Sequence, residues 1–274
     1  MHSVHDKYLK INEISIRYRE SGNGFPLLLV HGIAGFLEEW EMSIEELSKH
    51  YRVIALDLPG HGLSHKPQIA YTLDRLTGFL KDFVTEMKLE QFYLVGHSLG
   101  GAVCLNFVIK YPSLVKKLIV VNSAFTKFPT ACRFSSFKFL QKINIKVPLW
   151  ALRAVTRKSF FNKNSMTPDW LNSAYTYINK PGALRTMFSI IHECMSISGL
   201  KKDLVVAFQD GLSKIKIPVL IVYGNKDAIV PNENSFMLHK LICNSQIHLV
   251  QDCGHELQYE KSHEFCKISI QFLQ

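Results

Sequence analysis

The feature that most constrains this fold is the alternation of strand-like apolar segments with segments of helical spacing. Six segments have strand length and a mostly apolar composition: Pro26–Val30, Arg52–Asp57, Phe92–Val95, Lys117–Val121, Ile217–Tyr223 and Gln246–Val250. Such runs are typical of strands buried on both faces of a parallel sheet. Two earlier segments, Tyr8–Asn12 and Glu13–Glu20, instead alternate apolar and polar residues, which predicts a hairpin with one wet face.

Segments of helical spacing separate the predicted strands. Apolar residues between Leu73 and Met87 recur at helical intervals, and the stretch Leu99–Tyr111 is ended by Pro112. Further helices are expected over Glu233–Leu241 and from Glu256 onward. This alternation predicts an α/β fold, in which helices flank a doubly wound, mostly parallel sheet.

The central stretch breaks this rhythm and carries the whole excess of positive charge. Residues 124–212 contain no comparable β-branched run, and they hold 13 Lys and Arg against 4 Asp and Glu. The rest of the chain has 19 residues of each sign, whereas the formal net charge of the chain is +9. We therefore predict a core over residues 1–123 and 213–274 and a mainly helical cap inserted over residues 124–212.

Composition predicts a cytoplasmic protein with one catalytic domain. A chain of 274 residues with 47% apolar and 20% charged residues is ordinary for one globular unit. No apolar stretch has the length of a signal-peptide core at the start or of a membrane span later in the chain. The six cysteines include no CxxC pair, which argues against a zinc site and against a disulfide framework.

The segment Gly96-His97-Ser98-Leu99-Gly100 is the first motif that carries chemistry. It matches Gly-x-Ser-x-Gly and lies between a predicted strand and a predicted helix, which is the context that this motif requires. The glycines allow strand and helix to approach closely around a strained turn, so that the Ser98 hydroxyl projects. Without its context the motif would be an ordinary glycine-rich turn.

A serine hydroxyl is a poor nucleophile unless a base removes its proton. His255 follows the last predicted strand directly and should emerge at the same edge of the sheet as Ser98. Other histidines are expected to be structural, because His248 lies inside a strand and His263 inside a helix. His97 should point away from Ser98, and the glycine-flanked His31 and His61 should pack in turns.

The base needs an acid that holds it in the correct tautomer. Asp227 follows the strand Ile217–Tyr223 and should also lie at the carboxyl edge of the sheet. The order Ser98, Asp227, His255 is the one expected for this kind of strand-turn-helix nucleophile. Asp252 and Asp210 are the alternatives, the first on the same loop as His255 and the second within the predicted cap.

An oxyanion in a tetrahedral intermediate needs two hydrogen-bond donors. The backbone N–H of Leu99 is one candidate, at the start of a helix. The second is expected from the loop His31-Gly32-Ile33-Ala34-Gly35, where we choose the N–H of Ile33.

Taken together, the motifs resemble the α/β-hydrolase superfamily, in its branch of serine esterases and lipases with a helical cap. The matching segments are His31-Gly32, Asp57–Ser64, the Ser98 turn, Gly224–Pro231 and Gly254-His255. The predicted cap matches no motif. The resemblance implies an eight-stranded, mostly parallel sheet, an active site between its carboxyl edge and the cap, and no metal or organic cofactor.

The expected reaction is hydrolysis of carboxylic esters through an acyl-enzyme on Ser98. Alternatives on the same triad are a thioesterase and a C–C bond hydrolase, although the latter's oxyanion loop commonly reads differently from His31–Gly35. A ligand receptor that retains the fold without catalysis is a further alternative, because fold alone does not fix function. Enzymes of this architecture with Asp at the turn, such as epoxide hydrolases, are excluded by Ser98.

The cap suggests an additional role in contact with substrate or membrane. Phe137, Leu140, Ile143 and Val147 recur at intervals of three and four, which predicts a helix with an apolar stripe. Lys138, Lys142 and Lys146 would then lie together on another side. Such a surface would suit an acidic or lipid-like substrate, or weak contact with an anionic membrane. No nucleic-acid-binding motif accompanies the charge, so nucleic acid is not expected as a partner.

Overall fold

A computed structural model describes residues 5–123, 136–143, 145–196 and 199–274. Its centre is an eight-stranded sheet with the strand order β1-β2-β4-β3-β5-β6-β9-β10. The strands are β1 (Lys7–Ile11), β2 (Ile14–Ser21), β3 (Pro26–Val30), β4 (Arg52–Leu56), β5 (Phe92–His97), β6 (Val115–Val121), β9 (Val219–Gly224) and β10 (Ser245–Val250). The hairpin β1–β2 and the pair β2–β4 are antiparallel, whereas all other pairs are parallel. The predicted mostly parallel sheet is confirmed.

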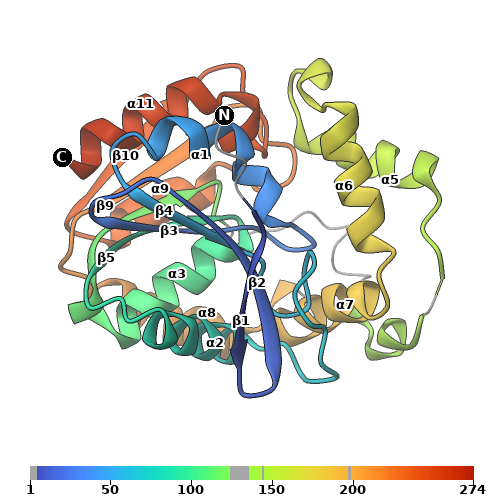
Figure 1. The fold of residues 1–274 in the computed structure, drawn as a ribbon. Helices are drawn as coiled ribbons and strands as arrows, with labels where there is room; N and C mark the ends of the chain where they lie inside the picture. The colour runs from blue at the N-terminus through green and yellow to red at the C-terminus, as the bar shows by residue number, and fades with distance from the viewer. Residues whose placement is uncertain (1–4, 124–135, 144, 197–198) are drawn as a thin grey trace.

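Helices cover both faces of this sheet (Figure 1). One layer holds α2 (Leu73–Glu86), α3 (Leu99–Lys110), α8 (Lys202–Leu212) and α9 (Glu233–Leu241). The other holds α1 (Glu41–Leu47), α10 (Leu257–Glu260) and α11 (Ser262–Leu273). Apolar side chains of alternate strand positions pack into one layer or the other, because successive side chains point to opposite faces. Parallel strands are therefore buried on both sides, as their apolar sequences predict.

Between β6 and β9 the described chain is mainly helical. It contains the 3-10 helices η4 (Lys138–Lys142), η5 (Arg157–Ser159) and η6 (Lys163–Ser165), the helices α5 (Leu149–Thr156), α6 (Pro168–Ile178) and α7 (Ala183–Cys194), and a short hairpin of β7 (Met195–Ser196) and β8 (Gly199–Leu200). In Figure 1, α5 and α6 stand to one side of the sheet. The cap boundaries at 124 and 212 remain a prediction. Helix α8 lies inside these boundaries, yet its Phe208 and Leu212 belong to the main core cluster.

The prediction of a helix along the apolar stripe from Phe137 to Val147 is wrong. Among the described residues of this stretch only η4 forms, and Ile143 already has an extended backbone with φ −67° and ψ 121°. β-branched residues such as Ile145 and Val147 favour extended structure, and the residue before Pro148 is disfavoured in the α region. These local preferences outweigh the helical spacing of the apolar residues.

Two further expectations concern cysteines and membrane spans. Five of the six cysteines are free in the structure, whereas Cys132 lies outside the described residues. No helix in the described part of the chain is both long and apolar enough to span a membrane.

Candidate active site

Ser98 occupies a sharp turn between the end of β5 and the start of α3. Its backbone angles, φ 52° and ψ −117°, are strained for a residue with a side chain. The Ser98 N–H donates to the carbonyl of Val121 at 2.9 Å, which attaches the turn to the end of β6. The side chain is held at the carboxyl edge of the sheet, as the motif predicts.

The glycines around Ser98 allow this turn to form. A Cβ on Gly96 would lie 2.4 Å from the carbonyl oxygen of Gly100, so strand and helix approach too closely for a side chain. A Cβ on Gly100 would lie 2.4 Å from the carbonyl oxygens of Val30 and His31 at the end of β3. The turn is therefore packed backbone against backbone.

His255 and Asp227 meet at the same edge of the sheet. His255 Nδ1 lies 2.7 Å from Asp227 Oδ2, while Asp227 Oδ1 accepts hydrogen bonds from the N–H groups of Ile229 and Val230 at 2.7 and 2.9 Å. Burial lowers the pKa of His255, but the adjacent Asp227 carboxylate, with smaller contributions from Glu256 and Glu39, more than offsets this and leaves the pKa above its ordinary value. An imidazole held in this way has Nδ1 protonated and Nε2 available as a base.

The loop that carries His255 is fastened to the Ser98 turn. His97 Nε2 donates to the carbonyl of His255 at 2.9 Å, and the two imidazole rings are 4.6 Å apart. The Asn122 amide donates to the carbonyls of His255 and Gly254 and accepts from the N–H of Gly224. No hydrogen bond joins Ser98 Oγ to His255 Nε2 in this structure, and such bonds are often long before substrate binds.

The predicted oxyanion donors lie beside Ser98. Leu99 is the first residue of α3, where N–H groups have no partner within the helix. The loop that contains Ile33 lies against the turn, because a Cβ on Gly32 would be 3.1 Å from the Ser98 Cβ. Neither the Leu99 nor the Ile33 N–H donates to another described residue, so both remain available.

The alternative residues occupy other positions. Asp252 lies on the loop after β10 with φ 47°, and Asp210 lies on α8 beside the core helices. Neither forms a hydrogen bond to His255 within the described residues. His31 accepts from the Leu58 N–H through Nε2 and His61 contacts its ring, in agreement with the expected packing roles.

A buried cluster of Glu39, His97 and Glu256 lies behind His255. Its ligand atoms are within 4.8 Å of one another and form the one group among the described residues that could hold a metal ion. Burial raises the pKa of Glu39 to about 8 and of Glu256 to about 7, and it lowers the pKa of His97 to about 4. Because His97 Nε2 donates to a carbonyl, its Nδ1 is an acceptor, 3.5 Å from Glu39 Oε2. A protonated Glu39 and a neutral His97 can therefore share a proton without a metal.

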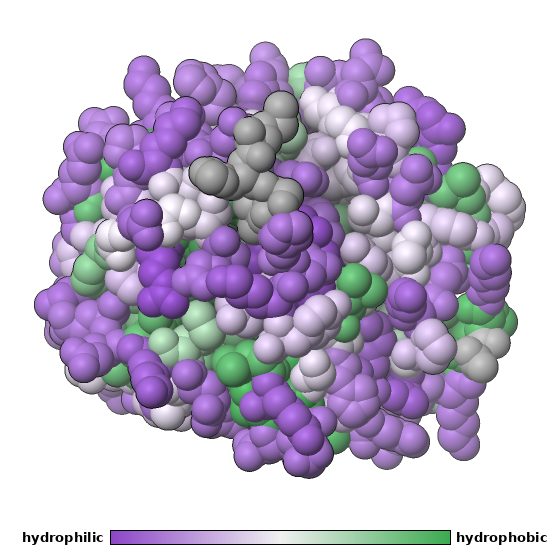
Figure 2. Space-filling view, in the orientation of Figure 1, coloured by the Kyte–Doolittle hydropathy of each residue, from purple (hydrophilic) through white to green (hydrophobic). Residues whose placement is uncertain are grey.

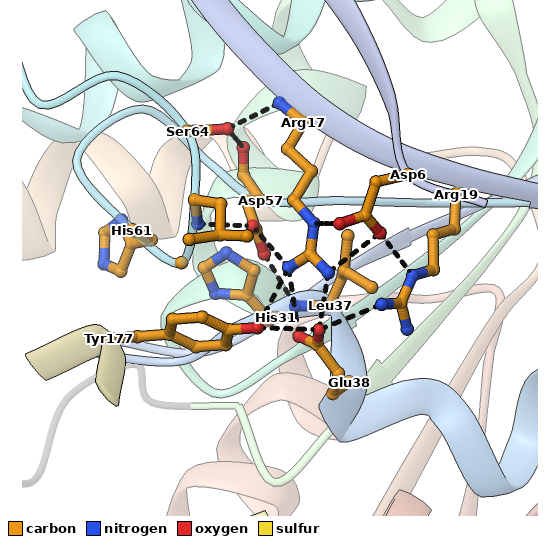
Figure 3. Close-up of polar contacts among 12 residues, drawn as sticks. Asp6, Arg17, Arg19, His31, Leu37, Glu38, Asp57, His61, Ser64 and Tyr177 are labelled. Atoms are coloured by element: carbon orange, nitrogen blue, oxygen red, sulfur yellow. Dashed lines mark hydrogen bonds and ion pairs between the residues drawn. The ribbon is translucent and has the colours of Figure 1, made fainter. Parts of the chain in front are cut away.

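The sequence contained little sign of a second buried cluster, around Arg17 of β2 (Figure 3). The guanidinium lies 2.6 Å from Glu38 Oε1, 2.8 Å from Asp6 Oδ2 and 3.2 Å from Asp57 Oδ2. Burial lowers the pKa of Arg17, but the three carboxylates raise it well above its ordinary value, so the side chain stays charged. Because β2 was predicted to have one solvent-exposed face, the sequence provided no reason to expect that Arg17 is buried.

The Arg17 cluster connects the predicted oxyanion loop to α6. Asp57 Oδ1 accepts from the N–H of Leu37 at 2.7 Å, just after that loop. Tyr177 of α6 donates its hydroxyl to Glu38 Oε1 at 2.9 Å (Figure 3). The cluster thereby fixes the loop and one helix of the predicted cap to the hairpin β1–β2.

A second contact joins the predicted cap to the loop of His255. The carbonyl of Ser159 accepts hydrogen bonds from the N–H groups of His255 and Glu256 at 2.6 and 3.1 Å. A Cβ on Gly254 would lie 2.6 Å from both the Ser159 carbonyl and the Phe161 nitrogen, so glycine is needed there. The segment after α5 thus lies directly against the candidate active site.

Two known proteins with similar sequences are hydrolases. The chain is 28% identical to a 2-hydroxy-6-oxo-6-(2'-aminophenyl)hexa-2,4-dienoic acid hydrolase of Metapseudomonas resinovorans, over 98% of this chain and 90% of that protein. It is also 28% identical to a 2-hydroxymuconate semialdehyde hydrolase of Pseudomonas sp. strain CF600, over 95% of this chain and 90% of that protein.

A solved structure of similar fold is a putative lipase of Acinetobacter baumannii, with a TM-score of 0.86 and 25% identity over 98% of this chain and 91% of that one. The family model of the alpha/beta hydrolase fold matches residues 26–262. That match spans the sheet from β3 onward, the Ser98 turn and the Asp227–His255 pair. The chain therefore belongs to the α/β-hydrolase fold family.

Proposed function

We propose that this hydrolase uses Ser98 as its nucleophile, His255 as the base that removes the serine proton, and Asp227 as the acid that orients the imidazole. The observation that carries this proposal is the 2.7 Å contact between His255 and Asp227 at the edge of the sheet where Ser98 forms its strained turn. The N–H groups of Ile33 and Leu99 would bind the oxyanion of the tetrahedral intermediate. Acyl transfer requires a nucleophile, a base in the correct tautomer and donors for the oxyanion, and these residues would supply all three.

The proposed substrate is an acid with a ketone or aldehyde carbonyl, cleaved at the C–C bond beside that carbonyl. The support comes from curated relatives that match nearly the whole chain and are named for 2-hydroxy-6-oxodienoic acids and for 2-hydroxymuconate semialdehyde. Ketonisation of the dienol places a proton on C5 and a 2-oxo group that can accept the electron pair of the C5–C6 bond. Attack at the 6-oxo carbon and loss of that bond then release a 2-hydroxydienoate and an acyl group, which water converts to a carboxylic acid. Residues 124–212 hold 13 basic and 4 acidic residues, and this excess of positive charge would attract a substrate that carries a carboxylate.

Ester hydrolysis, the reaction expected first, is the second candidate. One observation favours it, the similarity of fold to a putative lipase with a TM-score of 0.86. The same triad would cleave an ester with an alkoxide as leaving group in place of a carbanion. Because both reactions begin with attack on a carbonyl, only substrate preference separates them.

The test is a direct comparison of the two substrate classes with the purified chain. Loss of absorbance of 2-hydroxy-6-oxo-6-phenylhexa-2,4-dienoate is followed beside release of p-nitrophenol from acetate and butyrate esters, with Ser98→Ala as the control. The proposal predicts a kcat/KM for the dienoate that exceeds the ester values by two orders of magnitude or more, and no turnover by the variant. Faster cleavage of the esters would establish the second candidate instead.

A further inference from the structure

Large apolar side chains are exposed in the segment from residue 137 to 161. The exposed fractions reach 63% for Phe139, 65% for Ile145, 75% for Trp150 and 65% for Val155. Neither η4 nor α5 contains a single buried residue. Exposed apolar patches of this kind mark interaction sites when polar groups surround them.

The same segment is basic without any acidic residue. Residues 91–168 contain no Asp or Glu. Within this range seven bases are exposed on the described part of the predicted cap: Lys138, Lys142, Lys146, Arg153, Arg157, Lys158 and Lys163. None of the seven forms an ion pair with a described residue. Their charge is therefore not neutralised within the described chain.

Helix α5 shows how the two kinds of side chain are combined. Leu152 faces inward against the apolar cluster around Phe160 and Trp170. Trp150 and Arg153 of α5 and its C-cap residue Arg157 are exposed at intervals of three and four, so they share the opposite side of the helix. An outer face with an aromatic ring and two bases thus lies above an inner face that holds the cap together.

This face lies at the outer edge of the molecule. In Figure 1, α5 lies on the side of α6 that is remote from the sheet. Figure 2 shows apolar groups among hydrophilic ones along the same edge. A flat partner could therefore reach the exposed side chains without displacing the core.

We propose that the outer face of residues 137–143 and 145–163 docks on an anionic lipid surface. Bases attract the phosphate headgroups, while Trp150 and its apolar neighbours enter the headgroup region, where tryptophan is favoured. The absence of any acid within residues 137–163 distinguishes this segment from the mixed rim of a usual protein interface. This proposal is independent of the bond that the enzyme cleaves.

Vesicles test the proposal. The full chain is sedimented with phosphatidylcholine vesicles and with vesicles that also contain phosphatidylglycerol, at low and at high salt. We expect binding to the anionic vesicles alone, which weakens as salt rises because screening removes the attraction. The triple variant Lys138→Gln, Lys142→Gln, Lys146→Gln should bind roughly a hundredfold more weakly, at about fivefold for each base lost.

Tryptophan fluorescence reports insertion independently of sedimentation. Trp150 is 75% exposed, whereas Trp40 and Trp170 are buried at 0% and 6%. A blue shift of emission on addition of anionic vesicles would therefore come from Trp150. Trp150→Ser should abolish the shift and weaken sedimentation about tenfold, the order expected for one buried aromatic side chain.

A matched control comes from the core helix α9, where Phe236 and Lys240 are exposed one helical turn apart. The variant Phe236→Ser with Lys240→Gln should bind vesicles like the unchanged chain. Three results would overturn the proposal: no binding to anionic vesicles at low salt, equal loss of binding in the control, or binding without a change in Trp150 emission. The last would indicate a charge interaction with any polyanion, which soluble heparin would reproduce.

Discussion

Replacement of Arg17 by methionine would test the account of the buried charge cluster in Figure 3. The Arg17 side chain is 1% exposed, beside Glu38 at 10% and Asp57 at 0%. Methionine fills much of the same volume but leaves the buried Asp57 without its cation and leaves Glu38 with Arg19 as its one remaining cationic partner among the described residues. Removal of one partner from a buried ion pair costs about 3–5 kcal/mol, because the remaining charge is then uncompensated.

The expected loss of melting temperature follows from the size of the chain. At about 2.1 cal/mol/K per residue, a chain of 274 residues has an unfolding entropy of about 0.6 kcal/mol/K. The loss of stability then corresponds to a fall of about 5–9 °C at pH 8. Arg19→Met is the matched control. Arg19 is more exposed than Arg17, and its partners Asp6 and Glu38 both keep Arg17, so the variant should lower the melting temperature by less than about 2 °C.

The same variant should be more sensitive to pH. Burial raises the pKa of Asp57, and the nearby Arg17 opposes that rise. Without Arg17 the folded-state pKa of Asp57 increases further above its unfolded value, so stability is retained at low pH and lost as pH rises through the folded-state pKa. Thermal unfolding by circular dichroism at pH 5 and pH 8 measures the difference. A decrease in melting temperature of less than about 2 °C for Arg17→Met at pH 8, or equal decreases for the two variants, would refute the reasoning.

Three other substitutions test the candidate site and its turn. Glu256→Gln should move the acidic limb of the kcat/KM profile down by about half a pH unit, because the Glu256 carboxylate helps to raise the pKa of His255; an unmoved limb would contradict this coupling. Asp227→Asn should lower turnover by roughly a factor of a thousand or more while the melting temperature stays within a few degrees, and full activity would exclude this acid. Gly100→Ala should destabilise the fold by about 3 kcal/mol or more in denaturant titrations, since its Cβ would lie 2.4 Å from two backbone oxygens. Gly78→Ala, with nothing within 4 Å, should be neutral or stabilising, and similar losses in both would contradict the packing argument.

The parts of the fold that sequence predicts well have local causes. The strand Pro26–Val30 and the helix Glu233–Leu241 have the bounds that their apolar patterns predict. The Ser98 turn was also predictable, because Gly96 is required by its close approach to Gly100 within the same short motif. Asp227 and His255 meet because both follow neighbouring parallel strands, whose carboxyl ends lie at one edge.

The parts that sequence does not predict depend on contacts between distant segments. Glu39 approaches His97 across 58 positions of the chain, and neither lies in a pattern that demands a partner. Arg17 is buried only because acids from the N-terminal arm, from η1 (Leu37–Trp40) and from the end of β4 converge on it. The predicted helix along the stripe from Phe137 to Val147 is wrong for the opposite reason. Its helical spacing of apolar residues was outweighed by local preferences, those of the β-branched residues and of Pro148.

The central claim is that Ser98 is an activated nucleophile, and covalent labelling tests it most directly. The intact chain is treated with a fluorophosphonate at pH 8, and the modified residue is identified by peptide mass spectrometry. The account predicts one adduct, on Ser98, that is absent from Ser98→Ala and forms orders of magnitude more slowly in His255→Ala. Labelling of Ser98→Ala at the same rate, or a folded chain that never reacts, would contradict it.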